Sequence, residues 1–489
     1  MEKRDEEKRK YLLQFAQVHA DFRLPELNAL LKMNGLQPAD VYRLDDYDPM
    51  TPYLILNFPS ESAAIAVCER GVLFKMLLEL WAEAKDYDHL EEVTRNIPSS
   101  LSAAHYEAHV SWSCNVCAFG LSHSLERQNE IRSRLRHLPF KGPVCCQNPD
   151  QTFWIIERHE TRADGAPTSK DNVPERIYFG REVARSSSRR LVSRCDLKKR
   201  PYLGPTSMDN ELSLVMANMA LVRVGSIVLD PFAGTGSILL ACSNFGAFCF
   251  GTDIDVRVLR GKDGNNVNTN FDEFGLVRPE LVRCDSSMYL RHFKPRCFYD
   301  AIVCDPPYGI RAGARKAGSR QGRESIRQIL PERRATHIPQ TQPYPVEDVL
   351  VDLLDLAAKT LVGGGRLVYL LPTTYDFTDD DLPCHPCLRV VANSEQPMTQ
   401  KIGRRLITME KVSEYNPELR AAYFEISASS ATRPFAQLRE KIQGTSLAGS
   451  LDQRESKRRK FVRTERKDKA APASSSPPSS SSSLPLSPP

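Results

Sequence analysis

The sequence predicts an α/β protein in which an α+β region precedes a parallel sheet with helices on both faces. Three observations support this prediction. Between residues 205 and 430, apolar runs that end in an acid alternate with helix-like segments, as in strand–helix–strand units. Residues 1–185 instead mix short helical and strand-like segments. Residues 431–489 are basic and then rich in Ser and Pro, so we expect a disordered tail.

The composition is that of a globular chain with more than one domain. Its 489 residues, of which 41% are hydrophobic and 26% charged, are too many for one ordinary domain. No apolar run reaches the roughly 18 residues of a membrane span, and the N-terminus lacks the apolar core of a signal peptide. The 13 cysteines are scattered through apparent core strands. We therefore expect no membrane association and a reducing compartment, the cytoplasm.

The first region, residues 1–185, is expected to build its own core. Apolar residues recur with a helix-like pattern in three segments, Leu24–Met33, Ser60–Gly71 and Val72–Ala84. Strand-like segments are Tyr53–Phe58, Ala108–Trp112 and Thr152–Glu157. An arginine-rich stretch, residues 186–204, then connects this region to the second one.

Positive charge is concentrated in three segments. The net charge of +5 comes wholly from residues 451–470, which hold nine Lys or Arg and four acids. This part of the tail could be a nuclear address or a weak nucleic-acid contact, and a merely solvated tail is at least as frequent. The stretch 127–144 would face solvent or a polyanion. The insertion 312–345 holds seven Lys or Arg and two acids.

Two C-x-x-C pairs, Cys114/Cys117 and Cys384/Cys387, are candidates for a metal site. Four thiolates would suit zinc. The pairs are far apart, however, and the segment between them looks like a complete domain. Small buried thiols are therefore the favoured interpretation, and we assign no metal ligand.

From residue 205 on, the order of apolar runs predicts the site. Strand-like runs occupy 226–230, 247–255, 281–287, 299–309 and 362–372, and helical runs at 212–223 and 237–246 flank the first of them. Four runs carry an acid where the strand should end: Asp230, Asp253, Asp285 and Asp305. Ligands bind at the carboxyl edge of such sheets. A ligand with hydroxyls, amines and positive charge would organise these otherwise repelling acids.

The turn DPFAGTG (230–236) joins the first strand to its helix. Gly234 and Gly236 allow the backbone to approach a bound molecule at the start of the helix. The third glycine of the dinucleotide fingerprint is missing, so the turn alone is weak evidence, and a turn without ligand is the alternative. Asp253, at the end of the next strand, can accept hydrogen bonds from a ribose. This arrangement suits NAD as well as S-adenosylmethionine.

The segment YDAIVCDPPYGIR (299–311) distinguishes these two cofactors. Hydride transfer has no need of Asp305-Pro306-Pro307-Tyr308, whereas methyl transfer to an aromatic amino group does. The lone pair of that nitrogen is delocalised, and acceptors for its N–H groups turn it toward tetrahedral geometry. Asp305 and the Pro306 carbonyl would be those acceptors, because proline has no N–H. Tyr308 would stack on a flipped-out base. An incidental tyrosine after a proline-terminated strand is the alternative.

A longer set of motifs resembles one family, the catalytic subunit of the eukaryotic tRNA (guanine-10-N2)-methyltransferase. DPPY alone is shared with DNA adenine and other amino-methyltransferases, so the longer set is the more specific signal. The resemblance extends from about residue 11 to 415 and rests on FRLPEL (22–27), LPFKGPV (138–144), IYFGR (177–181), TSMDNELSLVMAN (206–218), DPFAGTG (230–236), GTDID (251–255), DPPYGIR (305–311), HPCL (385–388) and RRLITMEK (404–411).

The resemblance implies a THUMP-containing RNA-binding module, a Rossmann-like class I methyltransferase domain, and N2-methylguanosine at position 10 of tRNA as product. It also implies S-adenosyl-L-methionine as cofactor and a small zinc-binding activator subunit that covers apolar surface. Asp253 would bind the ribose, and Asp285 would lie near the adenine amino group. The guanine would be held by Asp305, Pro306, Pro307 and Tyr308. The cofactor-binding residues would be Thr206, Ser207, Met208, Asp230, Pro231, Phe232, Gly234, Thr235, Gly236, Asp253 and Asp285.

Two other functions stay open from the sequence. The first is amino-methylation of another RNA or of DNA, which a substrate assay would separate. The second is a non-catalytic RNA-binding subunit, against which the intact DPPY and cofactor acids argue.

The insertion 312–345, next to the catalytic motif, favours contact with tRNA phosphates and is expected to be disordered without tRNA.

Overall fold

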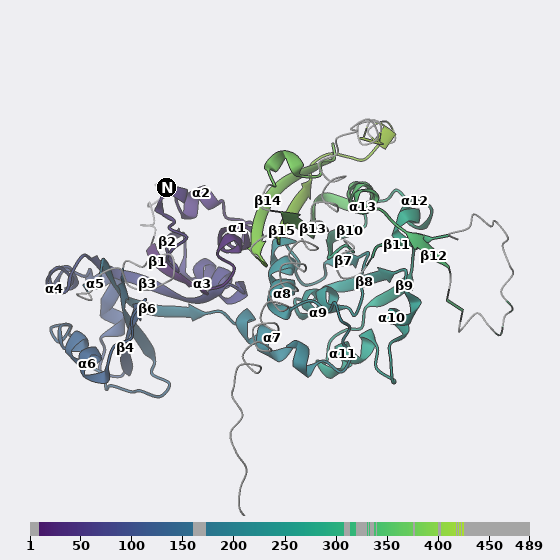
Figure 1. Cartoon of the computed structure of the whole chain (residues 1–489). Coiled ribbons are helices and arrows are strands. Elements are labelled where there is room, and N and C mark those ends of the chain that lie inside the picture. The colour runs from purple at the N-terminus through teal and green to yellow at the C-terminus, as the bar shows by residue number, and fades with distance from the viewer. Residues whose placement is uncertain are drawn as a thin grey trace, which may run out of the picture.

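The computed structural model describes residues 9–159, 173–307, 313–318, 330, 332, 337–338, 340–374, 377–399, 402–416, 418, 420–421 and 423–424. They form two large mixed sheets that lie side by side (Figure 1). The tail at 431–489 lies outside the described residues. Within the described part, no helix is long and apolar enough to cross a bilayer.

The first sheet has six strands in the order β2-β1-β3-β6-β5-β4. All neighbours are antiparallel except β4 and β5, which are parallel. The strands are β1 (Arg9–Phe15), β2 (Tyr53–Phe58), β3 (Phe74–Ala84), β4 (Trp112–Phe119), β5 (Gln151–Arg158) and β6 (Arg176–Arg185). The helices that accompany them are α1 (Arg23–Met33), α2 (Pro38–Val41), α3 (Glu61–Arg70), α4 (Tyr87–Arg95), α5 (Ser99–Ser102) and α6 (Leu125–Ser133).

Local sequence signals explain several of these elements. Ser60, Asp86 and Ser124 are the N-caps of α3, α4 and α6, and each side chain accepts a backbone N–H of the first turn. The predicted strand Tyr53–Phe58 is confirmed as β2. The predicted helix over Val72–Ala84 is wrong, because this segment forms β3.

The position of β3 in the sheet explains this error. Strand β3 lies between β1 and β6 and is buried on both faces. On one face, Leu77 and Trp81 pack in two different core clusters. On the other face, Leu78 packs in a third cluster. A continuous apolar run of this kind has no strand alternation to read. The strand expected at Ala108–Trp112 also begins later, at Trp112.

A short linking segment with α7 (Ser188–Arg194) leads to the second sheet, of order β14-β15-β13-β10-β7-β8-β9. From β13 to β9 the strands are parallel, and β15 and β14 add an antiparallel hairpin. The strands are β7 (Ile227–Asp230), β8 (Phe248–Asp253), β9 (Glu280–Arg283), β10 (Tyr299–Cys304), β13 (Leu361–Thr374), β14 (Leu388–Pro397) and β15 (Ile402–Lys411). The helices are α8 (Asn210–Met219), α9 (Ser237–Asn244), α10 (Val256–Arg260), α11 (Val267–Glu273), α12 (Tyr289–His292) and α13 (Val346–Thr360).

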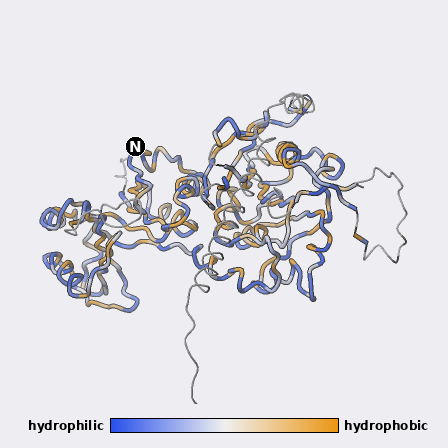
Figure 2. Tube along the Cα trace, in the orientation of Figure 1, coloured by the Kyte–Doolittle hydropathy of each residue, from blue (hydrophilic) through white to orange (hydrophobic). Residues whose placement is uncertain are grey.

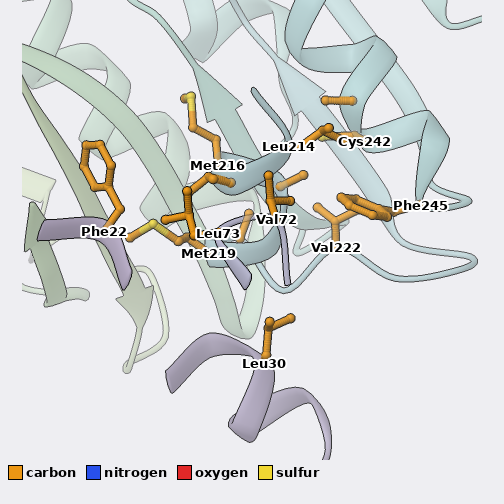
Figure 3. Packing of buried hydrophobic residues seen from close by; sticks show 14 of the residues in the cluster. Phe22, Leu30, Val72, Leu73, Leu214, Met216, Met219, Val222, Cys242 and Phe245 are labelled. Carbon is orange, nitrogen blue, oxygen red and sulfur yellow. The ribbon is translucent and has the colours of Figure 1, made fainter. Parts of the chain in front are cut away.

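One hydrophobic core joins the two sheets. Residues of the first region, such as Leu30 and Val72, pack in the same cluster as Met216 and Met219 of α8 (Figure 3). Along the chain, hydrophobic stretches follow the strands and the central helices, whereas hydrophilic stretches lie at the periphery (Figure 2). The two regions therefore share apolar surface that neither could leave in water without a large cost in free energy.

A buried polar network crosses the same contact. The Glu26 carboxylate of α1 accepts hydrogen bonds from the backbone N–H groups of Val72 (2.8 Å) and Leu73 (2.9 Å) and from the Asn218 amide of α8 (2.7 Å). Arg70 at the end of α3 donates to Asn218 Oδ1 (2.7 Å) and to a backbone carbonyl of the second region. Directional bonds of this kind define one relative position of the two regions.

The basic stretch 127–144 is partly engaged with the protein itself. Arg132 donates to the Cys114 carbonyl (2.8 Å), and Arg134 pairs with Asp88 (2.9 Å). The ion pair of Arg134 offsets one of the positive charges that this stretch offers to a polyanion, whereas the bond to the carbonyl holds Arg132 in place without changing its charge.

Candidate active site

The carboxyl edge of the second sheet gathers the predicted acids. Asp230 and Asp253 are the last residues of β7 and β8, and Asp285 and Asp305 follow β9 and β10 closely. Parallel strands bring these ends to one edge of the sheet. The structure therefore places all four acids where a ligand of an α/β sheet binds.

The turn after β7 is built around two glycines in the left-handed region, Gly234 at φ +52° and Gly236 at φ +79°. A Cβ at Gly236 would lie 2.6 Å from Val267 Cγ1, so this glycine is needed for close packing against α11. A Cβ at Gly234 would meet only a backbone oxygen at 3.8 Å. The space beside Gly234 is open, and a ligand can approach the backbone there.

Asp253 and Asp230 hold the shape of this turn. Asp253 accepts the Gly234 N–H (3.0 Å) through Oδ2 and the Asp255 N–H (2.8 Å) through Oδ1. Asp230 is almost fully buried and accepts the Phe232 N–H (2.9 Å). Each carboxylate oxygen has a second lone pair, so Asp253 can also accept from a ligand hydroxyl.

The electrostatics of this edge favour a cation. Burial raises the pKa of Asp230 well above its usual range, and the charges of Asp253 and Asp305 raise that pKa further. Burial also raises the pKa of Asp253, although hydrogen bonds from backbone N–H groups partly offset this effect. A positively charged ligand at this edge would relieve the mutual repulsion of the carboxylates.

The segment before α8 reaches the glycine turn through a hydroxyl pair. Ser207 Oγ and Thr235 Oγ1 lie 2.7 Å apart, and Ser207 Oγ also accepts the Gly204 N–H (2.9 Å). Of the two neighbours of Ser207, Thr206 is exposed and Met208 is buried in the core. The structure thus brings Ser207 to the turn, whereas Met208 contributes to packing.

Asp285 is held by both its own loop and the insertion. Its Oδ1 accepts the Ser287 N–H (3.0 Å) and hydroxyl (2.7 Å), and its Oδ2 accepts the Ala317 N–H (2.6 Å). The Ser286 hydroxyl in turn donates to the Pro231 carbonyl (3.1 Å). The β9 end, the glycine turn and the insertion are therefore linked directly.

The described part of the insertion folds over this edge. β11 (Arg315–Ala317) and β12 (Thr341–Pro343) form an antiparallel pair, so the expected disorder does not apply to its two ends. Ala314, Tyr344 and Val349 pack together, and Phe232 of the glycine turn packs against them. The Ala317 contact is not predictable from the sequence, since a backbone donor has no side-chain signal. The apolar residues Ala314 and Tyr344 at the ends of a basic loop were the available clue.

The DPPY segment is only partly described. Asp305 is half-buried, Pro306 is buried and Pro307 is half-buried. Tyr308 lies outside the described residues. The effect of Asp305 on the pKa of Asp230 indicates that the two carboxyl groups are near each other.

The C-x-x-C pairs do not form a joint metal site among the described residues. Cys114 and Cys117 lie on the strand β4, three positions apart, and pack in different core clusters on its two faces. Cys387 is buried and Cys384 is exposed. The predicted burial therefore applies to Cys387, whereas Cys114 and Cys117 are half-buried.

Two family models match consecutive segments of the chain. Residues 9–189 match the family model described as the Tmrp11 THUMP N-terminal domain, and residues 198–330 match the RMKL-like methyltransferase domain. The tRNA (guanine(10)-N(2))-methyltransferase TRMT11 of Dictyostelium discoideum is 37% identical over 428 residues, which cover 84% of this chain and 83% of that protein. The chain belongs to the TRMT11 family. TRMT11 of Homo sapiens is 36% identical over 420 residues, 83% of this chain and 89% of that protein.

Membership of the TRMT11 family confirms the resemblance and the predicted fold class. The THUMP model spans the whole first sheet, and the methyltransferase model spans β7 to β10, which carry the four acids. Among solved structures, TrmN from Thermus thermophilus aligns with a TM-score of 0.41 at 18% identity and covers 82% of this chain and 100% of that one.

Proposed function

We propose that this chain is the catalytic subunit of a tRNA methyltransferase that places a methyl group on the exocyclic N2 of guanosine 10. One observation supports this most: in a TRMT11-family chain, Asp305-Pro306-Pro307 follows β10 at the same sheet edge as the glycine turn and its acids. The TRMT11 relative of Dictyostelium discoideum is named a tRNA (guanine(10)-N(2))-methyltransferase. We take residues 1–185 as the RNA-binding part, 186–204 as the connector and 205–430 as the catalytic domain, which acts in the cytoplasm.

The residues at this edge fit S-adenosyl-L-methionine. The opening beside Gly234 leaves room for backbone approach, Asp253 has lone pairs for ribose hydroxyls, and Asp285 lies at the end of β9 where it can accept from an adenine amino group. Ser207 and Thr235 would border the same molecule. When bound, the cofactor supplies an electrophilic methyl group on a positively charged sulfur.

The chain's own residues would prepare the amino nitrogen for attack. Asp305 and the Pro306 carbonyl would accept its two N–H groups and direct its lone pair away from the ring. Asp305 or a water would take the proton that the nitrogen loses once it has received the methyl group. Positioning supplies much of the acceleration, so no strong base is needed before attack. Tyr308 would hold the guanine by stacking.

Transfer of labelled methyl groups to unmodified tRNA tests this function. The full chain would be co-expressed with its activator, and Asp305→Ala would be compared with wild type. We expect N2-methylguanosine at position 10 and a loss of about 100-fold or more in Asp305→Ala with cofactor binding retained, since an acceptor aimed at the reacting group is removed. Methylation at another nucleotide would show that the substrate is wrong. Failure to bind cofactor would favour the non-catalytic alternative.

We further propose that the small zinc-binding activator binds at β9. This strand is the edge of its sheet and pairs only with β8 among the described strands. On this strand Val282 is 57% exposed, and Val277, which precedes the strand, and Phe248, at the start of β8, are also exposed. An open strand edge with apolar side chains is a surface that a partner covers by adding a strand.

A further inference from the structure

A compact group of side chains in the first region is not used by the proposed reaction. His123, Glu157 and His159 each direct a ligand atom to one point, and these atoms all lie within 4.8 Å of one another. Both imidazole Nε2 atoms contact the same carboxylate oxygen, Glu157 Oε2, at 2.6 Å and 2.8 Å. We refer to these three residues as the His–Glu–His cluster.

The topology of the first sheet explains why the three residues meet. Strands β4 and β5 are parallel neighbours, so their carboxyl ends lie at the same edge. His123 lies in the loop after β4, and His159 directly follows β5. Glu157 and His159 are two positions apart on an extended chain, which places them on one face. The sequence signal, E-x-H after a strand, is short and separated from His123 by 33 intervening residues.

The cluster is buried. The side chains of His123, Glu157 and His159 are 9%, 1% and 3% exposed. The second carboxylate oxygen, Oε1, accepts a hydrogen bond from the Tyr87 hydroxyl at the start of α4. A carboxylate this deep needs a compensating charge or several donors, because burial of an isolated charge is costly.

We propose that the His–Glu–His cluster binds a Zn²⁺ ion. Two imidazole nitrogens and one carboxylate oxygen are a set that zinc prefers, with a water in the fourth position. The Tyr87 hydroxyl on Oε1 is the outer hydrogen bond that orients a ligating carboxylate. The proposal is independent of the methyl-transfer chemistry, since the cluster belongs to the other sheet.

The spacing of the atoms is compatible with an ion after a small adjustment. Ligand atoms about 2.1 Å from a tetrahedral zinc lie roughly 3.4 Å from one another. The two N···O separations of 2.6 Å and 2.8 Å must widen by about 0.8 Å and 0.6 Å. His123 belongs to a loop and His159 ends a strand, so side-chain rotations can provide this change. Each imidazole would change tautomer, so that its Nε2 atom presents a lone pair to the ion instead of an N–H.

The ion would tie three elements together. It would connect the loop that precedes α6, the end of β5 and, through Tyr87, the start of α4. Both helices lie over the core face that contains Phe153 and Ile155. Zinc binding would therefore stabilise the fold of the RNA-binding region, because the ligands do not converge in the unfolded chain.

Zinc content and stability test the proposal in the full chain co-purified with its activator. The variants are Glu157→Gln, which keeps the side-chain shape, and the double change His123→Ala/His159→Ala. His137→Ala is the matched control, since that histidine lies in the same region and bonds to Thr94 instead. We expect wild type and control to carry about one zinc more per complex than either variant. Subtraction between complexes removes any zinc held by the activator.

A second measurement keeps the test decisive if a variant folds poorly. A chelator should lower the unfolding temperature of the first region in wild type and in His137→Ala, and added zinc alone should restore it. Glu157→Gln should show neither change. Equal zinc content in wild type and Glu157→Gln would overturn the proposal. Loss of stability without loss of zinc would also overturn it and would identify the cluster as hydrogen bonds only.

Discussion

At the scale of single residues, the pKa values of the acids at the site depend on their burial and on the charges of their neighbours. Asp230 has a raised pKa because it is buried, and the neighbouring carboxylates Asp253 and Asp305 add to this effect. Both neighbours occupy the same sheet edge. A bound cation would favour the ionised form of these carboxyl groups, whose pKa values are raised. Binding of a positively charged ligand would therefore release protons.

Cofactor affinity should therefore depend on pH. The raised pKa values of Asp230 and Asp253 mean that both groups hold protons above the usual range of aspartate. A positively charged sulfur binds best to the ionised forms, so affinity for S-adenosylmethionine should rise with pH through the raised pKa values and then level off. Calorimetric titration at several pH values measures this. S-adenosylhomocysteine, which lacks the positive charge, is the control, and an equally steep dependence for it would contradict the explanation.

The two glycines of the turn should respond differently to alanine. Gly236→Ala places a Cβ 2.6 Å from Val267 and also retains a left-handed φ, so we expect a loss of roughly 1–3 kcal/mol in the free energy of unfolding. Gly234→Ala meets no close atom, so only its left-handed φ should lower stability, by about 1 kcal/mol, and its main effect should be on cofactor affinity. Denaturant unfolding and cofactor titration separate the two effects. Adding Val267→Ala should recover part of the stability of Gly236→Ala but none of the affinity of Gly234→Ala.

At the scale of elements, the edge strand β9 carries the proposed activator surface. Val282→Lys should weaken co-purification of the activator at least tenfold, because a charge would enter an apolar contact. Leu44→Lys is the control, since Leu44 is exposed on the other region. Co-purification and cofactor binding would be measured together. Normal co-purification of Val282→Lys would place the activator elsewhere.

The sequence predicted elements well where turn residues or a terminal acid mark their ends. Tyr53–Phe58 is a short apolar run between two prolines and forms β2, and Asp230 and Asp253 mark the ends of β7 and β8. Val72–Ala84 was wrong because a central strand buried on both faces has no alternation. The contact of Ala317 with Asp285 was missed because it depends on how the insertion folds back over the sheet, which local sequence does not encode. The His–Glu–His cluster was also not predicted, because its residues are far apart in the sequence and meet only in the folded sheet.

At the scale of the whole molecule, the relative position of the two regions decides which nucleotide reaches the site. The apolar core at α8 supplies contact area, and the network of Glu26, Asn218 and Arg70 supplies direction. Burial raises the pKa of Glu26 despite its three hydrogen bonds, so the group is sensitive to the loss of a donor. A nearby but more exposed contact, Lys32 with Glu410 at 2.5 Å, also crosses between the regions.

Removal of the Asn218 amide should therefore change tRNA methylation more than cofactor binding. Asn218→Ala leaves Glu26 and Arg70 without a shared buried partner, which should cost about 1–3 kcal/mol in stability. The RNA-binding region would then lose its defined orientation, so kcat/KM for tRNA should fall while the affinity for cofactor at the distant sheet edge is kept. Lys32→Ala should have a much smaller effect, because the Lys32 side chain is half exposed and Glu410 keeps its ion pair with Arg366. Equal losses in the two variants, or a parallel loss of cofactor affinity in Asn218→Ala, would show that the network supports the fold in general and does not set the angle between the regions.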